Sequence, residues 1–145
     1  MSKFTLEPLL RHRKLTEENL QKELAVLNKV LLAEQQKLKD HSKNRIALLG
    51  ELEQKQSHGV AISEISLYVR FIEELSGNMT KQEETVRIVQ EQVDNKRQEL
   101  IEATKKKKIL ERLKEKTLRA YEHVLRKKEE DFLNEVGINQ FNRGV

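Results

Sequence analysis

The sequence predicts an all-α protein, a long antiparallel two-helix coiled-coil hairpin with an overhanging C-terminal helix. Two apolar stripes keep a strict seven-residue repeat, a single credible turn separates them, and the 145 residues include one proline. Charged residues make up 36% of the chain and hydrophobic residues 37%, so the composition favours elongated solvated helices over a thick globular core. Such an architecture leaves almost no room for a catalytic pocket.

The first stripe runs from Leu6 to Lys55 in alternating steps of three and four residues, and nine of its fifteen positions are leucine. Apolar residues held to a seven-residue repeat require a left-handed supercoil that buries one narrow face against a partner helix. The stripe therefore predicts a helix over about residues 5–56. Pro8 falls in the first turn of this helix, where its missing N–H is tolerated.

A turn is expected at about residues 57–62, because this stretch carries the glycine and serines of a helix connection. Gly59 is the residue that interrupts the helical pattern. Ser63 follows the turn, and serine is a preferred N-cap residue. We therefore expect Ser63 to cap the second helix.

The second stripe runs from Ile65 to Val124 and predicts a helix over about residues 63–135, followed by a tail at 136–145. A glycine also occurs within Ser76–Asn78, but the apolar repeat continues through this segment. We interpret it as a softened helix, since a helical glycine costs only about 1 kcal/mol relative to alanine. The whole chain, 1–145, is then a single coiled-coil hairpin.

Folding at this turn brings together residues whose numbers sum to about 120, so that Leu31 would lie near Val89. Apolar residues then meet apolar residues, and we expect a monomeric hairpin. The second helix extends past the first by some twenty residues. Two explanations stay open for the apolar side chains on this overhang, fraying of the helix or docking onto a partner. These side chains are Tyr121, Val124, Leu125 and Phe132.

Charges divide unevenly along the chain. Residues 1–50 carry 10 basic and 6 acidic side chains, residues 51–104 carry 6 and 11, and residues 105–145 carry 12 and 7. In the expected hairpin, the basic run at 11–14 lies opposite the basic run at 105–108, where a coiled coil normally pairs opposite charges. A solvated lysine-rich face would explain either run alone. Their convergence favours an acidic partner surface at the terminal end.

Residues that support catalysis or cofactor binding are not grouped in the sequence. The four histidines are scattered, cysteine is absent and no glycine-rich loop follows a strand, so we expect no enzyme, no metal and no cofactor. The basic run alternates with Glu111 and Glu115 and lacks aromatic side chains, which disfavours nucleic-acid binding. No apolar run suits a membrane span or a signal peptide, so a soluble intracellular protein is expected.

One segment beside the turn carries more apolar surface than a two-helix seam can cover. Tyr68, Ile72 and Leu75 follow the seam, whereas Leu67 and Phe71 lie four residues apart on a neighbouring face. Two explanations stay open: the end of the first helix wraps over this face, or the face is a docking patch. The residues that would wrap over it are Leu48, Leu49 and Leu52.

This segment and the amino-terminal residues resemble the bacterial flagellar export protein family FliJ. The shared features are Phe-x-Leu-x-Pro-Leu-Leu-x-x-Arg at residues 4–13, a long charged helix, a short glycine-containing turn, and Tyr68-x-x-Phe71-Ile72-x-x-Leu75. The resemblance covers essentially the whole chain in length, hairpin architecture and basic terminal end.

The resemblance implies a cytoplasmic component of the flagellar type III export apparatus, peripheral at the inner face of the cell membrane. The family is similar to the central stalk of rotary ATP synthases. Its terminal coiled-coil end enters the hexameric export ATPase, and another portion engages the membrane export gate protein. The family is also linked with the escort of empty export chaperones.

Carried onto this sequence, the resemblance assigns part of the apolar segment to the export gate. With Leu67 added from the apolar pattern, the expected gate-binding residues are Leu67, Tyr68, Phe71 and Leu75. Asn78 and Gln82 stand where relatives tend to have a small residue and a basic or histidine residue.

Charge placement alone nominates residues for ATPase binding. They are Arg11, Arg13, Lys105, Lys106, Lys107, Lys108 and Arg112. Two alternative functions stay open, an injectisome stalk protein of the same architecture and a generic structural coiled-coil adaptor. A parallel dimer would need a straight helical path through Gly59, which the turn sequence disfavours.

Overall fold

The computed structural model describes residues 4–144, which form two helices and no strand. Helix α1 spans Glu7–Ser57 and helix α2 spans Ile62–Arg143. The predicted all-α antiparallel coiled-coil hairpin is confirmed. Contacts divide the chain into two units, which we describe separately: a turn unit of residues 19–100, and a terminal unit of residues 1–18 and 101–145.

Helix α1 starts where the sequence places its first turn. The amide of Glu7 donates a hydrogen bond to the carbonyl of Phe4 at 3.1 Å, and the amide of Leu10 donates to the carbonyl of Leu6 at 2.9 Å. Pro8, the second residue of the helix, has no N–H, and none is needed in a first turn.

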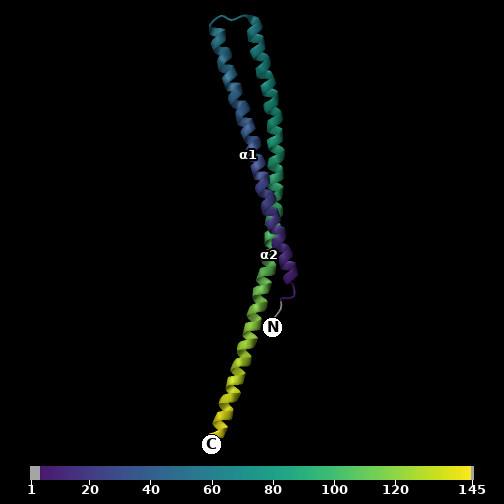
Figure 1. Ribbon diagram of the computed structural model, residues 1–145, viewed down its shortest axis with the longest axis vertical. Helices are drawn as coiled ribbons and strands as arrows, with labels where there is room; N and C mark the ends of the chain where they lie inside the picture. Colours follow the sequence, from purple (N-terminus) through teal and green to yellow (C-terminus); the bar gives the residue numbers. More distant parts are fainter. Residues whose placement is uncertain (1–3, 145) are drawn as a thin grey trace. The chain divides into compact units, whose positions relative to one another are not determined.

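The connection between the helices consists of residues 58–61 and closes the turn unit at the end shown uppermost in Figure 1. Gly59 has a φ of 75°, a region that residues with a Cβ atom avoid. The amide of His58 donates to the carbonyl of Lys55 at 3.2 Å and so closes the last turn of α1. The expected glycine turn is therefore present.

Helix α2 begins at Ile62, one residue before the expected cap. The carbonyl of Ala61 accepts hydrogen bonds from the amides of Glu64 at 3.1 Å and Ile65 at 3.3 Å, so Ala61 occupies the N-cap position. The expectation for Ser63 is wrong, because the left-handed glycine reverses the chain early enough for the helix to start before it. Ser63 lies within the first helical turn.

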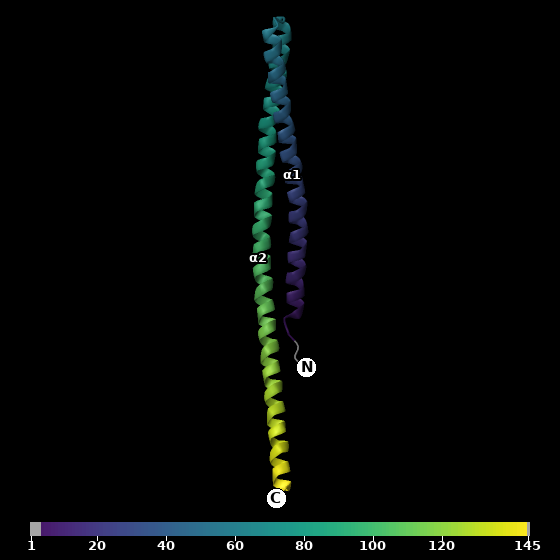
Figure 2. The ribbon, with the colours of Figure 1, turned by 90° about the vertical axis from the view of Figure 1, so that its left-hand side faces the viewer.

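The core of the turn unit is a narrow apolar seam between α1 and the first half of α2, which lie side by side in Figures 1 and 2. Leu31, Val89 and Val93 are buried there, which confirms the expected proximity of Leu31 and Val89. Burying one such side chain fully contributes about 1.5–3 kcal/mol. Three partly buried side chains pack against this cluster: Leu24, Leu27 and Val86.

A polar contact interrupts the seam of the turn unit. Gln82 Nε2 donates hydrogen bonds to Glu34 Oε2 at 2.5 Å and to the backbone carbonyl of Glu34 at 2.9 Å. The hydrogen bond from Gln82, followed by one from Lys37, lowers the pKa of the Glu34 carboxyl. A single polar pair among apolar layers specifies register, because a shifted pairing would leave both groups without partners.

In the terminal unit, the start of α1 packs against α2 through three buried apolar side chains, Leu10, Ala103 and Leu110. Lys114 Nζ lies 2.9 Å from Glu7 Oε2 and ties the start of α1 to α2. The C-terminal part of α2, drawn in yellow, has no second helix beside it in either Figure 1 or Figure 2, so the predicted overhang is present.

Helix α2 continues to Arg143, so the expected helix end near residue 135 is wrong. Gly137 does not stop the helix, because its cost is only about 1 kcal/mol and no proline follows it. The chain leaves the helix at Gly144, whose amide donates to the carbonyls of Gln140 at 3.1 Å and Phe141 at 3.2 Å. Val145, the last residue of the expected tail, lies outside the described residues.

Candidate functional site

The residues predicted to bind the export gate all lie on α2 in the turn unit, and we call them the turn-side patch: Leu67, Tyr68, Phe71 and Leu75. Leu67 is 51% exposed and Phe71 is 54% exposed, whereas Tyr68 and Leu75 are partly buried in the seam. The predicted division into seam and off-seam residues is therefore present in the structure.

Tyr68 is held by α1. Its hydroxyl donates to Glu51 Oε2 at 3.3 Å, and Lys55 Nζ lies 5.6 Å from the centre of its ring, within cation–π range. Lys55 Nζ also lies 2.6 Å from Glu64 Oε1, and this hydrogen bond is the main cause that raises the pKa of Lys55. Tyr68 thus joins the two helices near the turn, and only part of its ring is open to a partner.

Phe71 and Leu75 line an open groove of about 630 Å³ that runs between α1 and α2 within the turn unit. Leu48 and Ala47 of α1 add to its apolar surface. The rest of the lining is polar: Asn44, Glu51, Glu74 and Asn78. The groove thus combines an apolar floor with two carboxylates, which suits an apolar anchor flanked by basic or amide groups.

The end of α1 covers this face only in part. Leu48 lines the groove beside Phe71, but the Phe71 ring remains half exposed and Leu49 is exposed as well. Leu67 is not among the groove-lining residues and stands on open surface. The first explanation therefore holds only in part, because α1 supports Phe71 from one side and leaves the other side open. The docking role of this face stays a prediction.

The residues nominated for ATPase binding lie in the terminal unit, and they do not form one uniform surface. Arg13 and Lys107 are partly buried in the seam. Five others are exposed, and we call them the terminal basic patch: Arg11, Lys105, Lys106, Lys108 and Arg112. Lys105 makes one contact along its own helix, with Glu102 at 3.4 Å.

Lys107 is engaged by Glu17, a residue for which the sequence suggested no role beyond its place on the first stripe. Lys107 Nζ lies 2.8 Å from Glu17 Oε1, and Thr104 Oγ1 donates to Glu17 Oε2 at 2.7 Å. The Glu17 side chain is only 11% exposed. The hydrogen bond from Lys107, and then that from Thr104, lower the pKa of Glu17.

The expected clash of two basic runs is therefore reduced by Glu17. This carboxylate enters the seam where like charges were expected to face each other, and it neutralises Lys107. The sequence contained a signal for this contact, because Glu17 is a polar residue at a position of the first stripe. In the expected hairpin it falls opposite Ala103 and Lys107 of the second stripe, and Thr104 is adjacent to Ala103. Lys107 is consequently a structural residue of the seam, and the terminal basic patch is what remains available to a partner.

A shallow groove lies beside the terminal basic patch, within the same unit. Phe4 and Pro8 from the start of the chain line it together with Leu118 of α2. Arg11 also lines this groove, so an exposed cation stands next to apolar surface. A partner that binds the terminal basic patch could therefore make apolar contacts as well.

Residues 4–144 contain no group of three or more side chains of the types His, Cys, Asp or Glu that could hold a metal ion. No helix among the described residues combines the length and apolar character needed to cross a membrane. Every buried side-chain nitrogen or oxygen described by the structure has a hydrogen-bond partner.

Comparisons with known proteins identify relatives of this chain. The model of the family described as flagellar FliJ protein matches residues 2–145. Among solved structures, the chain is similar to a protein described as a YscO homolog, CT670, from Chlamydia trachomatis, with 20% sequence identity and a TM-score of 0.51. The alignment covers 99% of this chain and 93% of that chain, and at this identity it supports the fold alone. A comparison with curated proteins found no match.

Proposed function

Since the chain belongs to the flagellar FliJ protein family and is thereby associated with type III protein export, we propose that it is a stalk-like coupling protein of the export apparatus. In this proposal, the terminal unit inserts into the hexameric export ATPase, and the turn unit binds the membrane export gate protein. The protein would act in the cytoplasm, at the inner face of the cell membrane. Because the matching family is flagellar, the flagellar system is proposed over an injectisome.

The observation that carries the proposal is that each unit presents a candidate binding surface, and the two surfaces differ in chemistry. The turn unit offers the half-exposed Phe71 ring over an apolar groove with a carboxylate rim. The terminal unit offers an exposed cluster of cations, the terminal basic patch. Two surfaces of different chemistry on one coiled coil suit two different partners.

Phe71 is the residue expected to anchor the gate. A buried aromatic anchor in a partner groove is a typical hot spot, worth about 2 kcal/mol or more of binding free energy. Its position beside Leu48 and Leu75 holds the ring in place before binding, which limits the entropy lost on association. The export gate is therefore assigned to the turn-side patch.

The ATPase contact is expected to depend on charge. Exposed cations accelerate and strengthen association with an acidic surface, and the effect falls as salt is added. Lys107 is excluded from this role because it is bonded to Glu17 in the seam. Escort of empty export chaperones would be a further activity of the same protein, for which we assign no residues.

Binding measurements with the purified export ATPase and with the purified cytoplasmic part of the gate protein test the proposal. Reversing Lys105, Lys106 and Lys108 to glutamate should weaken ATPase binding at least tenfold at low salt and flatten its salt dependence, while gate binding stays the same. A matched control reverses three lysines of α1 in the turn unit, Lys29, Lys39 and Lys43. Equal loss in both variants would show a general charge effect and contradict the assignment.

The reciprocal variant, Phe71→Ala, should weaken gate binding by at least tenfold and leave ATPase binding unchanged. Ile46→Ala, an exposed aliphatic residue of α1 outside the groove, serves as its control. If neither partner binds the wild-type chain, the stalk function itself is wrong.

A further inference from the structure

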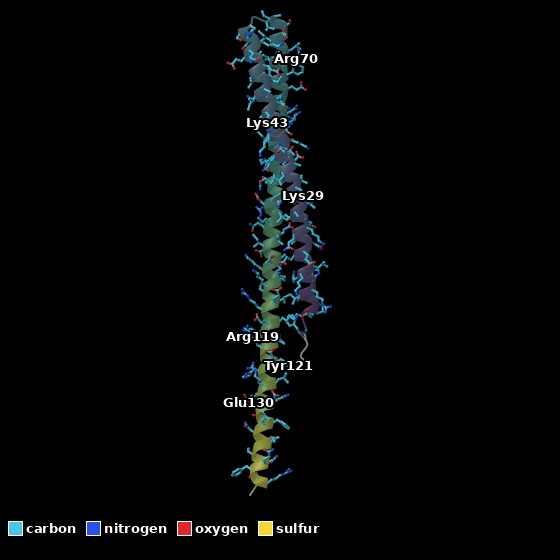
Figure 3. The ribbon with its side chains drawn as sticks, turned by 60° about the vertical axis from the view of Figure 1, so that its left-hand side comes forward. Lys29, Lys43, Arg70, Arg119, Tyr121 and Glu130 are labelled. Carbon is cyan, nitrogen blue, oxygen red and sulfur yellow. The ribbon has the colours of Figure 1, made fainter. Side chains whose placement is uncertain are left out.

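The groove of the turn unit is lined by two sets of four residues, one set from each helix. They are Asn44, Ala47, Leu48 and Glu51 from α1, and Phe71, Glu74, Leu75 and Asn78 from α2. Each set has the spacing i, i+3, i+4 and i+7, which is the spacing of the four residues that receive one side chain of a facing helix in a coiled coil. Figure 3 labels Lys43 and Arg70, which directly precede the first residue of each set.

The seam is incomplete at the floor of this groove. Leu75 would meet Arg45 across the seam, because their numbers sum to 120, but the Arg45 side chain is exposed. This layer therefore receives an apolar side chain from α2 alone. Leu48 and Leu75 remain only partly buried, so apolar surface from both helices is open to a further side chain.

The rim of the groove carries negative charge that the chain itself does not neutralise. Glu51 and Glu74 line the groove, and none of the other lining residues is basic. Within residues 4–144, neither carboxylate takes part in an ion pair; Glu51 accepts a hydrogen bond from the Tyr68 hydroxyl at 3.3 Å. The rim thus favours cationic side chains on whatever occupies the groove.

The walls of the groove select the secondary structure of its occupant. Both walls are helical, so their backbone groups are already bonded within α1 and α2, and the described residues offer no strand edge to pair with. An extended segment would place its own N–H and C=O groups against the apolar floor without partners. A helix satisfies these groups internally.

We propose that the groove takes an α-helix of the partner, which packs as a third helix against α1 and α2. An apolar side chain of this helix would lie on Leu48 and Leu75, and lysine or arginine side chains next to it would pair with the two rim carboxylates. The groove spans about 10 Å, or one heptad. Leu67 lies four residues before Phe71 and extends the apolar surface toward the turn, so the bound helix would have about two heptads.

This inference rests on the proposed function only for which protein supplies the helix, so a synthetic probe tests the groove without the gate. The probe is a labelled alanine-based peptide of about three heptads, with leucine at positions a and d and lysine at e and g. Fluorescence anisotropy should detect its binding to the full-length chain. A peptide with glutamate at e and g, and one whose central heptad carries two prolines, should each bind at least tenfold more weakly.

Substitutions in the chain test where the probe binds. Phe71→Ala should weaken binding of the lysine probe at least tenfold, and Ile46→Ala should leave it unchanged. Replacing Glu51 and Glu74 by lysine should reverse the preference, so that the glutamate probe binds more tightly. A control replaces Glu53 and Glu73 by lysine, because both are exposed and neither lines the groove. It has the same net charge and should keep the original preference. Circular dichroism checks the helicity of every variant.

Three results would overturn the proposal: equal binding of the proline-containing probe, an unchanged preference in the Glu51 and Glu74 variant, or the same reversal in its control. The purified cytoplasmic part of the gate protein provides the second arm. If it competes with the lysine probe, the helix belongs to the gate. If the gate binds but the lysine probe does not, the stalk function stands and the helical occupant is wrong. If the probe binds and the gate does not, the groove is a helix site and its assignment to the gate is wrong.

Discussion

The middle of the turn unit and the stretch next to its turn are built from the same two helices, yet they bury their seams to different extents. In the middle, Val93 is fully buried and Leu31 is 9% exposed. Between residues 32 and 88, by contrast, no side chain is buried, although the apolar repeat continues. The repeat alone therefore does not fix burial. Stability is concentrated in the middle, and the stretch near the turn keeps apolar surface available.

The polar pair of Glu34 and Gln82 lies at the border between these two regions. On α1, Glu34 lies about one helical turn after the buried Leu31. On α2, Gln82 lies about one helical turn after Asn78, which lines the groove together with Leu75. Gln82 stands where relatives of the family were expected to carry a basic or histidine residue. In this chain, its amide fixes register within the seam.

The largest effect is expected in the buried middle. Leu31→Ala should lower the free energy of unfolding by about 2–5 kcal/mol, because a buried leucine truncated to alanine loses apolar burial and leaves a cavity. Leu32→Ala is the matched control, since Leu32 is adjacent in sequence and 67% exposed. Urea denaturation monitored by circular dichroism measures both. An equal loss of unfolding free energy in the two variants would contradict the conclusion that stability is concentrated in the buried middle of the seam.

A smaller effect is expected at the turn. Gly59→Ala should cost about 1–2 kcal/mol, since a Cβ atom is disfavoured at a φ of 75°. Gly50→Ala should have the opposite sign and stabilise by up to about 1 kcal/mol, because Gly50 lies within α1 with open space around it. Thermal unfolding of the two variants distinguishes these outcomes. Destabilisation by both would mean that the turn geometry is not the cause.

Phe71→Ala should have a still smaller effect on stability, about 1 kcal/mol or less, because half of the ring is already exposed. The substitution should instead weaken binding to the gate and reduce swimming motility. The melting temperature of the variant, measured beside its affinity for the gate, separates the two. A loss of about 3–5 kcal/mol in stability, as for a fully buried phenylalanine, would place Phe71 in the core.

The smallest effect concerns pH. The hydrogen bond from Gln82 lowers the folded pKa of Glu34 from its ordinary value of 4.5. The contribution of this carboxylate to stability is therefore fully present above that value and is lost as the pH falls through the folded pKa. Glu34→Gln should remove this component. The stability difference between wild type and Glu34→Gln should therefore shrink below pH 4.5. A difference that stays constant down to about pH 2 would exclude a role for the charge.

Much of the fold followed from periodicity and one glycine. The stripe positions, the turn at Gly59 and the unpaired end of α2 all depend on local sequence, so they could be predicted. The helix end at Arg143 and the cap at Ala61 were missed, because helix ends depend on differences of about 1 kcal/mol that one weak residue does not decide.

The candidate surfaces were predictable only in part. The i and i+4 spacing of Leu67 and Phe71 located the turn-side patch, but the extent to which Leu48 covers it depends on tertiary packing. The basic runs predicted the position of the terminal basic patch. They did not predict that Lys107 lies in the seam, because its position there depends on the ion pair with Glu17. That contact joins residues 90 positions apart, and a run of charges does not reveal which of its members is already bonded.

The ion pair between Lys55 and Glu64 has a consequence for how the turn unit folds. It closes a loop between residues only 9 positions apart, whereas the contact between Glu34 and Gln82 joins residues 48 positions apart. Forming the longer contact first would cost about 1.5 kcal/mol more in loop-closure entropy. The hairpin is therefore expected to zip up from its turn, with each contact shortening the loop left for the next. The stretch of the seam next to the turn, which is the least buried, would then form early. The well-packed middle would form afterwards and stabilise the hairpin.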